Sequence, residues 1–174
     1  DGGAFMQEYS KGKKKAAVKK IGSSKLHGTI VTFEADPEVF STGENKIKYD
    51  FDRIVSHMRQ QAYLVRGLKI SLFDLRETVE KMKDTDVFYI RELGIEAPSM
   101  TFYFDGGLIS LIRFYNQTLK PLHKNIFYVE KQNDNFESVE VALQYTDDIA
   151  SRVLPFANNI YNAEGGTHIT GFKA

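Results

Sequence analysis

Apolar residues recur at three- and four-residue steps between positions 51 and 62, the spacing that places side chains on one face of an α-helix. Asp50 comes immediately before this run and can cap its first turn, because a carboxylate accepts a hydrogen bond from an early backbone amide. Gly67 can end the helix. Residues 68–74 then alternate apolar and polar, which predicts a half-buried strand. The apolar helical face consists of Phe51, Ile54, Val55, Met58 and Ala62.

The second half of the chain predicts one helix and one hairpin. Asp105-Gly106-Gly107 reads as a hinge, since glycine reaches backbone angles that other residues avoid, and a helical pattern follows at about 107–118. Strands at 125–131 and 136–145 flank a polar turn and predict a β-hairpin. A further strand is expected within 153–158, where Pro155 favours an edge position. The last residues read as the start of another helix.

The first third of the chain predicts short strands. Residues 4–9 and 16–21 flank a turn at 10–13, and the β-branched segment His27–Phe33 reads as a third strand that ends before Pro37. Residues 43–48 are polar and predict a loop. Weaker patterns at 77–83 and 87–90 fit a short helix and a short strand.

Composition narrows the class of protein. Hydrophobic residues make up 42% of the 174 residues, which suffices for a core, and no apolar run approaches the roughly 20 residues that a membrane span needs. The chain has no cysteine, and it shows no secretory signal, so we expect a cytoplasmic protein without disulfides. Its formal net charge of zero does not argue for a nucleic-acid partner.

A local basic run stands out against this neutral background. Lys11–Lys20 contains six lysines, which could contact phosphates or protect an exposed strand edge. No aromatic residue interleaves the lysines between positions 11 and 20. We favour the strand edge, because charge runs of this kind are common on strand edges.

The sequence offers few catalytic candidates. The four histidines form no zinc-binding pair, and neither a Walker A loop nor a nucleophile elbow is present, so we predict no catalytic residue and no metal ligand in this chain. Gly28-Thr29 can read a planar base edge, because glycine permits close approach and a threonine hydroxyl both donates and accepts; the simpler reading is the start of a strand. The glycine pairs at 106–107 and 165–166 fit tight turns before helices, and Asp147-Asp148 fits a solvated loop.

Several segments, in the same order, resemble the ATPase (B) subunit of bacterial type IIA DNA topoisomerases, the family of gyrase B and its topoisomerase IV counterpart. The closing segment Asn158–Phe172 is the most family-specific of them. The other matching segments are Gly28–Phe33, Arg59–Leu64, Gly67–Leu72, Tyr103–Leu108, Pro121–His123 and Val139–Tyr145.

The resemblance implies an α+β fold in two parts. Residues 1–105 would form the C-terminal part of a GHKL-type ATPase α/β sandwich, the type shared with Hsp90, MutL and histidine kinases. Residues 106–174 would form the start of a transducer domain similar to the second domain of ribosomal protein S5. The chain is therefore expected to be a fragment of a longer subunit, and its 76–100 segment is longer than the family usually has there.

The resemblance also implies one edge of an ATP site. Gly28 and Thr29 would lie in the adenine pocket, with the Thr29 hydroxyl in a hydrogen-bond network with an aspartate and a water, and Val31 would line the apolar floor. The parent protein would bind ATP and Mg²⁺. The family's general base, magnesium-binding asparagine, adenine-reading aspartate, glycine-rich lid and γ-phosphate lysine have no counterpart in the sequence. We therefore expect no tight nucleotide binding and no ATP hydrolysis by this chain alone.

The implied parent function is ATP-driven passage of one DNA duplex through another, with ATP, DNA and the A-type cleavage subunit as partners. No membrane partner is expected, and the fragment is expected to be monomeric. Gyrase and topoisomerase IV share the matching residues. The alternative is a non-enzymatic nucleic-acid-binding or scaffold module that uses Lys11–Lys20 and the 127–145 hairpin. A designed or rearranged protein that reuses this part of the fold is a third reading.

Overall fold

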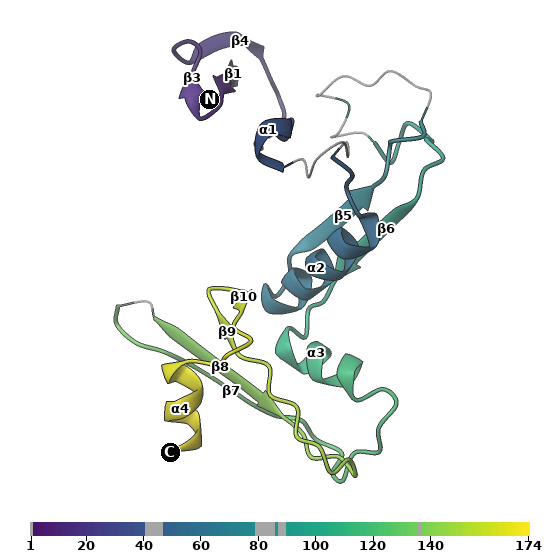
Figure 1. Ribbon diagram of the computed structural model, residues 1–174, viewed down its shortest axis with the longest axis vertical. Helices are drawn as coiled ribbons and strands as arrows, with labels where there is room; N and C mark the ends of the chain where they lie inside the picture. Colours follow the sequence, from purple (N-terminus) through teal and green to yellow (C-terminus); the bar gives the residue numbers. More distant parts are fainter. Residues whose placement is uncertain (1, 41–46, 79–85, 87–89, 136) are drawn as a thin grey trace. The chain divides into compact units, whose positions relative to one another are not determined.

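The structure is a computed structural model that describes residues 2–40, 47–78, 86, 90–135 and 137–174. The chain forms two compact units (Figure 1). Unit 1 consists of Asp1–Tyr49 and Glu77–Glu96, and unit 2 of Asp50–Arg76 and Ala97–Ala174. Short helices alternate with two-stranded antiparallel sheets, which confirms the α+β class. The expected domain boundary at 105/106 stays a prediction.

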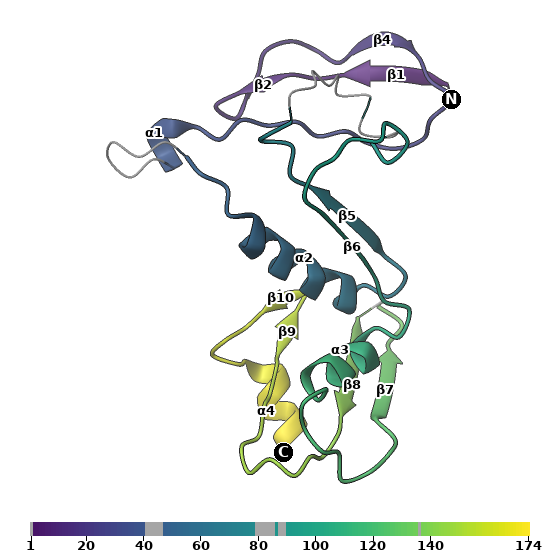
Figure 2. The ribbon, with the colours of Figure 1, turned by 90° about the vertical axis from the view of Figure 1, so that its right-hand side faces the viewer.

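Unit 1 is built on two small ladders. Strand β1 (Gly3–Met6) pairs with β4 (Lys19–Ser23) (Figure 2). Strand β2 (Tyr9–Ser10) pairs with β3 (Lys13–Lys14). Lys11 and Gly12 link β2 to β3 with φ angles of 47° and 77°, as a two-residue hairpin turn requires at both positions. The predicted turn at 10–13 is confirmed. One helical turn, α1 (Pro37–Phe40), follows later in the unit.

The strand predicted at His27–Phe33 is absent, because this segment joins no ladder among the described residues. Its apolar side chains stay in solvent, with Val31 79% and Phe33 74% exposed. β-propensity reflects packing on a pleated, hydrogen-bonded neighbour, so β-branched residues alone do not form a strand. The helix and strand predicted at 77–83 and 87–90 and the loop predicted at 43–48 lie largely outside the described residues.

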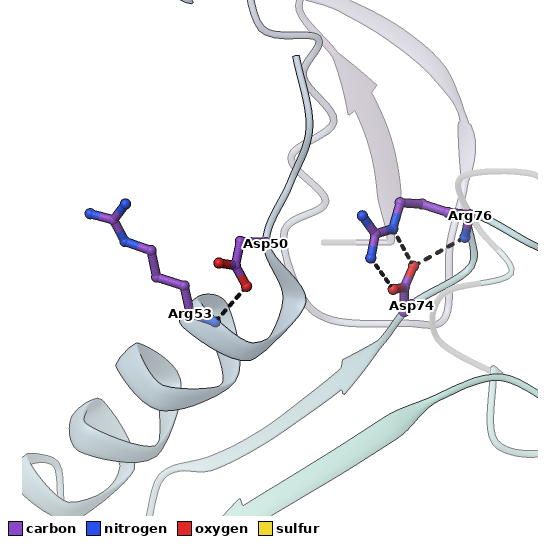
Figure 3. Close-up of polar contacts among 4 residues, drawn as sticks. All are labelled: Asp50, Arg53, Asp74 and Arg76. Carbon is purple, nitrogen blue, oxygen red and sulfur yellow. Dashed lines mark hydrogen bonds and ion pairs between the residues drawn. The ribbon is translucent and has the colours of Figure 1, made fainter. Parts of the chain in front are cut away.

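Unit 2 begins with the predicted amphipathic helix, α2 (Phe51–Leu64). An Asp50 carboxylate oxygen accepts the Arg53 backbone N–H at 3.1 Å, so the predicted N-cap is confirmed (Figure 3). The helix packs on the hairpin of β5 (Lys69–Phe73) and β6 (Ser99–Tyr103). Val55, Ala62 and Phe102 are buried at this contact. The spacing of apolar residues along α2 therefore identified the buried face correctly.

The rest of unit 2 continues this packing. Helix α3 (Leu108–Tyr115) contacts α2 and β8, and β7 (Phe127–Gln132) pairs with β8 (Ser138–Leu143) in the predicted hairpin. The strand expected within 153–158 is reduced to β9 (Phe156–Ala157), which pairs with β10 (Ile160–Tyr161). It is short because Pro155 donates no hydrogen bond and Asn158-Asn159 already turns the chain. The helix expected at the C-terminus is α4 (Thr167–Lys173).

Candidate functional site

The residues expected at the adenine pocket lie on the segment His27–Phe33 of unit 1. Gly28, Thr29 and Val31 are all exposed. Among the described residues, the Thr29 hydroxyl has no hydrogen-bond partner. The structure thus presents these three residues on one accessible segment. Their role in nucleotide binding stays a prediction.

The best-built site of the chain is the junction at Asp105-Gly106-Gly107, where strand β6 passes into helix α3. Gly107 has φ 53° and ψ −129°, a combination that is essentially restricted to glycine. The backbone N–H of Leu111 donates to the Gly107 carbonyl at 3.1 Å and begins the helix. The predicted turn before this helix is therefore present, and the backbone angles of Gly107 explain why a glycine stands there.

An aromatic cluster holds the junction together. Tyr63 near the end of α2 is 5% exposed and stacks on Phe104, with ring centroids 3.7 Å apart and planes inclined by 15°. The Tyr63 ring also lies 5.7 Å from the ring of Phe114 in α3. The guanidinium carbon of Arg59 lies 5.3 Å from the Phe102 ring centroid and 5.6 Å from that of Phe114. One helix is thereby tied to residues on both sides of the glycine pair.

Electrostatics at this cluster favour the neutral tyrosine. Burial raises the pKa of the Tyr63 hydroxyl, and the nearby positive charge of Arg59 opposes that shift without cancelling it. The Arg59 guanidinium instead makes cation–π contacts with the rings of Phe102 and Phe114, and these contacts require no buried carboxylate.

A second contact joins the end of α2 to the β7–β8 hairpin. The Arg66 guanidinium donates to the Tyr128 hydroxyl at 3.0 Å and its carbon lies 5.5 Å from the centroid of the same ring. That hydroxyl lies 3.0 Å from a carboxylate oxygen of Glu130 and 3.2 Å from one of Glu140. The two glutamates are directly opposite each other across the ladder, where like charges repel. Arg66 and the Tyr128 hydroxyl offset that repulsion.

Tyr128 responds to these surroundings. Partial burial raises the pKa of its hydroxyl, and the carboxylates of Glu130 and Glu140 raise it further, while Arg66 acts in the opposite direction. The Tyr128 hydroxyl therefore stays protonated. It can donate a hydrogen bond to one glutamate while it accepts a hydrogen bond from Arg66.

The family-specific closing segment also contacts α2. Asn158 and Asn159 have φ angles of 48° and 64° and form the turn between β9 and β10. Asparagine tolerates this left-handed conformation better than most residues. The Gln61 side-chain amide donates to the Asn159 carbonyl at 2.8 Å. Helix α2 is thus a partner of both α3 and the turn at 158–159, and Arg66, two residues beyond its end, adds the contact with the β7–β8 hairpin.

Sequence reasoning missed the contact between Arg66 and the hairpin. The hairpin register predicted from 125–131 and 136–145 could have indicated that Glu130 and Glu140 face each other, because opposite residues share a face. Nothing in the spacing of residues indicated that Arg66 reaches Tyr128, because the two lie 62 positions apart. The residues of the aromatic cluster were visible only as apolar positions on separate elements.

The side chains around this junction make ring, cation–π and hydrogen-bond contacts. Within the described residues, no group of three or more histidines or carboxylates could hold a metal ion. The part of the chain that the structure describes also contains no helix of the length and apolarity required to cross a bilayer. What the site offers is a helix clamped at several points to the segment after Gly107.

Comparison with known proteins places this geometry in a family. The family model described as DNA gyrase B matches residues 107–174. The DNA gyrase B protein of Archaeoglobus fulgidus is 38% identical over 178 residues, covering 100% of this chain and 24% of its own length. That of Clostridium acetobutylicum is 36% identical over 173 residues, covering 99% of this chain and 24% of its own length. The chain therefore spans about a quarter of the length of these relatives.

Solved structures of gyrase B proteins have a similar fold. The 43K ATPase domain of Thermus thermophilus gyrase B, determined in complex with an aminocoumarin, superposes with a TM-score of 0.74 at 25% identity and covers 99% of this chain and 41% of its own. The DNA gyrase B protein of Myxococcus xanthus has the same fold, with a TM-score of 0.70 at 19% identity, covering 99% of this chain and 44% of its own. By sequence along its whole length and by fold, the chain belongs to the DNA gyrase B family.

Proposed function

We propose that this chain is part of the ATP-hydrolysing subunit of a type IIA DNA topoisomerase and links its nucleotide site to the DNA-cleaving machinery. The observation that carries the proposal is the match to DNA gyrase B proteins along the whole chain. The function concerns the longer protein, of which the chain represents about a quarter if it resembles these relatives in length. ATP, Mg²⁺, DNA and an A-type cleavage subunit are its proposed partners, and the cytoplasm its proposed location.

The two proposed domains follow one another along the chain. Residues 1–105 belong to the nucleotide-binding domain and 106–174 to the transducer; the start of the family match at residue 107 supports this boundary. Gly28, Thr29 and Val31 form an edge of the adenine pocket. In this proposal the glutamate base, the magnesium ligand and the γ-phosphate lysine come from other segments of the longer protein.

The packing of unit 2 gives the proposed linkage a physical basis. A change at the nucleotide site can act on the transducer only through elements that resist deformation, and close-packed interiors do so. Helix α2 meets this requirement, because the Tyr63 ring stacks on Phe104 before the glycine pair and contacts Phe114 beyond it. A displacement of α2 would therefore be transmitted across the junction rather than absorbed at Gly107.

A chimera tests the function. The segment of Thermotoga maritima DNA gyrase B that matches this chain, 36% identical over 180 residues, is replaced by the chain. We expect the chimera to bind and hydrolyse ATP and, with the A-type cleavage subunit of Thermotoga, to change DNA topology in an ATP-dependent manner. A folded chimera that binds no ATP would overturn the proposal. A smaller graft of residues 107–174 provides a second test if the full graft does not fold.

The same chimera tests the proposed adenine contact. Thr29→Ala should weaken ATP binding about three- to tenfold, the loss expected when one hydrogen-bonding hydroxyl is removed. Thr32→Ala is the matched control, since it removes the same hydroxyl from an exposed residue of the same segment and should leave the affinity unchanged. Equal effects of the two substitutions would refute the assignment of Thr29.

The non-enzymatic alternative finds no support in these relatives, which are all named as DNA gyrase B proteins.

A further inference from the structure

The zero net charge of the chain conceals a strong separation of charge. Residues 11–25 contain seven lysines and no acidic residue. The whole chain has 23 basic and 23 acidic residues, so the remainder has 23 − 7 = 16 basic and 23 acidic residues and a net charge of −7. A field of one sign is therefore concentrated on one short stretch of unit 1.

The fold of unit 1 keeps these lysines in solvent. All seven are exposed, and four of them lie on strands: Lys13 and Lys14 in β3, and Lys19 and Lys20 in β4. Lys11 occupies the turn and is paired, with its Nζ 2.8 Å from a Glu38 carboxylate oxygen and 3.8 Å from one of Asp36. The other six form no ion pair with any described residue. We call these six residues the lysine face, although neighbouring lysines on a strand project to opposite sides of their ladder: Lys13, Lys14, Lys15, Lys19, Lys20 and Lys25.

Aromatic side chains lie beside this face, although none interrupts the lysines in sequence. The ladder register places Phe5 opposite Lys20 and Tyr9 opposite Lys14, and directly opposite residues of an antiparallel pair project to the same side. Both rings are 64% exposed. The sequence shows no aromatic residue among the lysines, whereas the cross-strand pairing places two rings beside them.

We propose that the lysine face binds the sugar-phosphate backbone of double-stranded DNA, without reading its sequence. The partner class rests on the proposed topoisomerase function, while the charge and exposure of the face are independent of it. Lysine ammonium groups are flexible point charges suited to phosphate contacts. Residues 11–25 contain no arginine, the residue whose rigid planar fork is best suited to bidentate recognition. The six unpaired lysines limit the number of phosphates that the face can neutralise.

The salt dependence of DNA binding measures how many phosphates these lysines neutralise. Each phosphate neutralised on a DNA duplex contributes about −0.9 to the slope of log K against log salt concentration. Six lysines therefore set a limit of about −5 for the slope of binding to this face. Removal of four of them should make the slope less steep, by at most about 3 to 4.

The experiment uses the 174-residue chain and a short fluorescein-labelled duplex, with affinity measured by anisotropy over a range of salt concentrations. The test variant carries Lys13→Gln, Lys14→Gln, Lys19→Gln and Lys20→Gln. The matched control carries Lys48→Gln, Lys69→Gln, Lys120→Gln and Lys131→Gln, four exposed lysines outside the face, so the net charge changes equally. Circular dichroism confirms that both variants are folded. A Lys11→Gln variant should bind like the original chain, because Lys11 is already engaged by Glu38.

The proposal predicts that the test variant loses most of its affinity and slope, that the control keeps both, and that two duplexes of unrelated sequence bind equally. Equal losses in test and control variants, or the absence of salt-dependent binding by the original chain, would overturn it. Binding to phosphatidylserine vesicles or to an acidic peptide but not to the duplex would do so too. In the Thermotoga chimera, the test substitutions should leave ATP hydrolysis without DNA unchanged, so failure of DNA binding is distinguishable from failure of the proposed function.

Discussion

Substitution of Tyr63 tests whether the aromatic cluster holds α2 to the segment beyond Gly107. Tyr63→Leu removes a 5% exposed ring that contacts the rings of Phe104 and Phe114. Each aromatic pair contributes about 0.5–1.5 kcal/mol beyond the area it buries, so the two pairs together contribute about 1–3 kcal/mol. The smaller side chain also leaves unfilled space, which brings the expected loss to about 2–4 kcal/mol in the free energy of unfolding.

Tyr63→Phe is the matched control, because it keeps both ring contacts and removes only the hydroxyl. Burial raises the pKa of that hydroxyl, and it has no hydrogen-bond partner among the described residues. Its removal therefore leaves no partner unsatisfied, and we expect a change within about 1 kcal/mol, in either direction. The difference between the two variants isolates the ring contacts from the polar group.

Urea unfolding followed by near-UV circular dichroism measures both variants. The leucine variant should unfold at a lower urea concentration with an unchanged m-value, which indicates lost stability rather than an altered unfolded state. A double-mutant cycle with Phe114→Leu should give a coupling free energy of about 0.5–1.5 kcal/mol. If the leucine and phenylalanine variants unfold at the same urea concentration, the ring contacts do not hold the junction and the reasoning fails.

Three further predictions follow from the structure. Gly107→Ala should lower the free energy of unfolding in urea by about 1–3 kcal/mol, because a residue with a side chain is strained at φ 53° and ψ −129°. Gly171→Ala in α4, where the space around the residue is open, should instead raise it by up to about 1 kcal/mol. Equal effects of the two substitutions would contradict this reasoning. The hydrogen bond from the Arg76 side chain (Figure 3) lowers the pKa of Asp74 below its usual 3.8. This pair therefore stabilises the fold above that pH, and the stabilisation is lost as the pH falls through the pKa of the folded state. Arg76→Gln should raise the pKa of Asp74, as measured by NMR titration. The purified chain should hydrolyse no ATP in a phosphate-release assay, and turnover abolished by Thr29→Ala would refute that.

Elements with a complete local pattern were predictable from the sequence. Helix α2 carries its periodic face and its Asp50 cap within one continuous segment, and the β7–β8 hairpin carries two strands and a turn in another. Their hydrogen bonds are local, so spacing alone identifies them. The segment His27–Phe33 has the same kind of β-branched pattern but forms no ladder among the described residues, because a strand depends on a neighbour that its own residues do not specify.

Only part of the candidate site could be predicted from the sequence. The glycine pair before α3 was visible as a turn, because its backbone freedom is a property of the residue itself. The partners that surround it were not visible: Arg66 meets Tyr128 across 62 positions, and Gln61 meets Asn159 across 98. Sequence spacing contains no information about contacts that form only when separate elements pack together.

By itself, the sequence determined helices α2, α3 and α4, the β7–β8 hairpin and the family, since these depend on local periodicity and on residue identities. Tertiary structure alone decided that α2 is clamped on both sides of Gly107, and that exposed aromatic rings lie beside the lysines of unit 1. The physical reason is range: backbone hydrogen bonds in helices and hairpins join near neighbours, whereas ring stacking, ion pairing and cross-strand register depend on which distant segments the packing brings together.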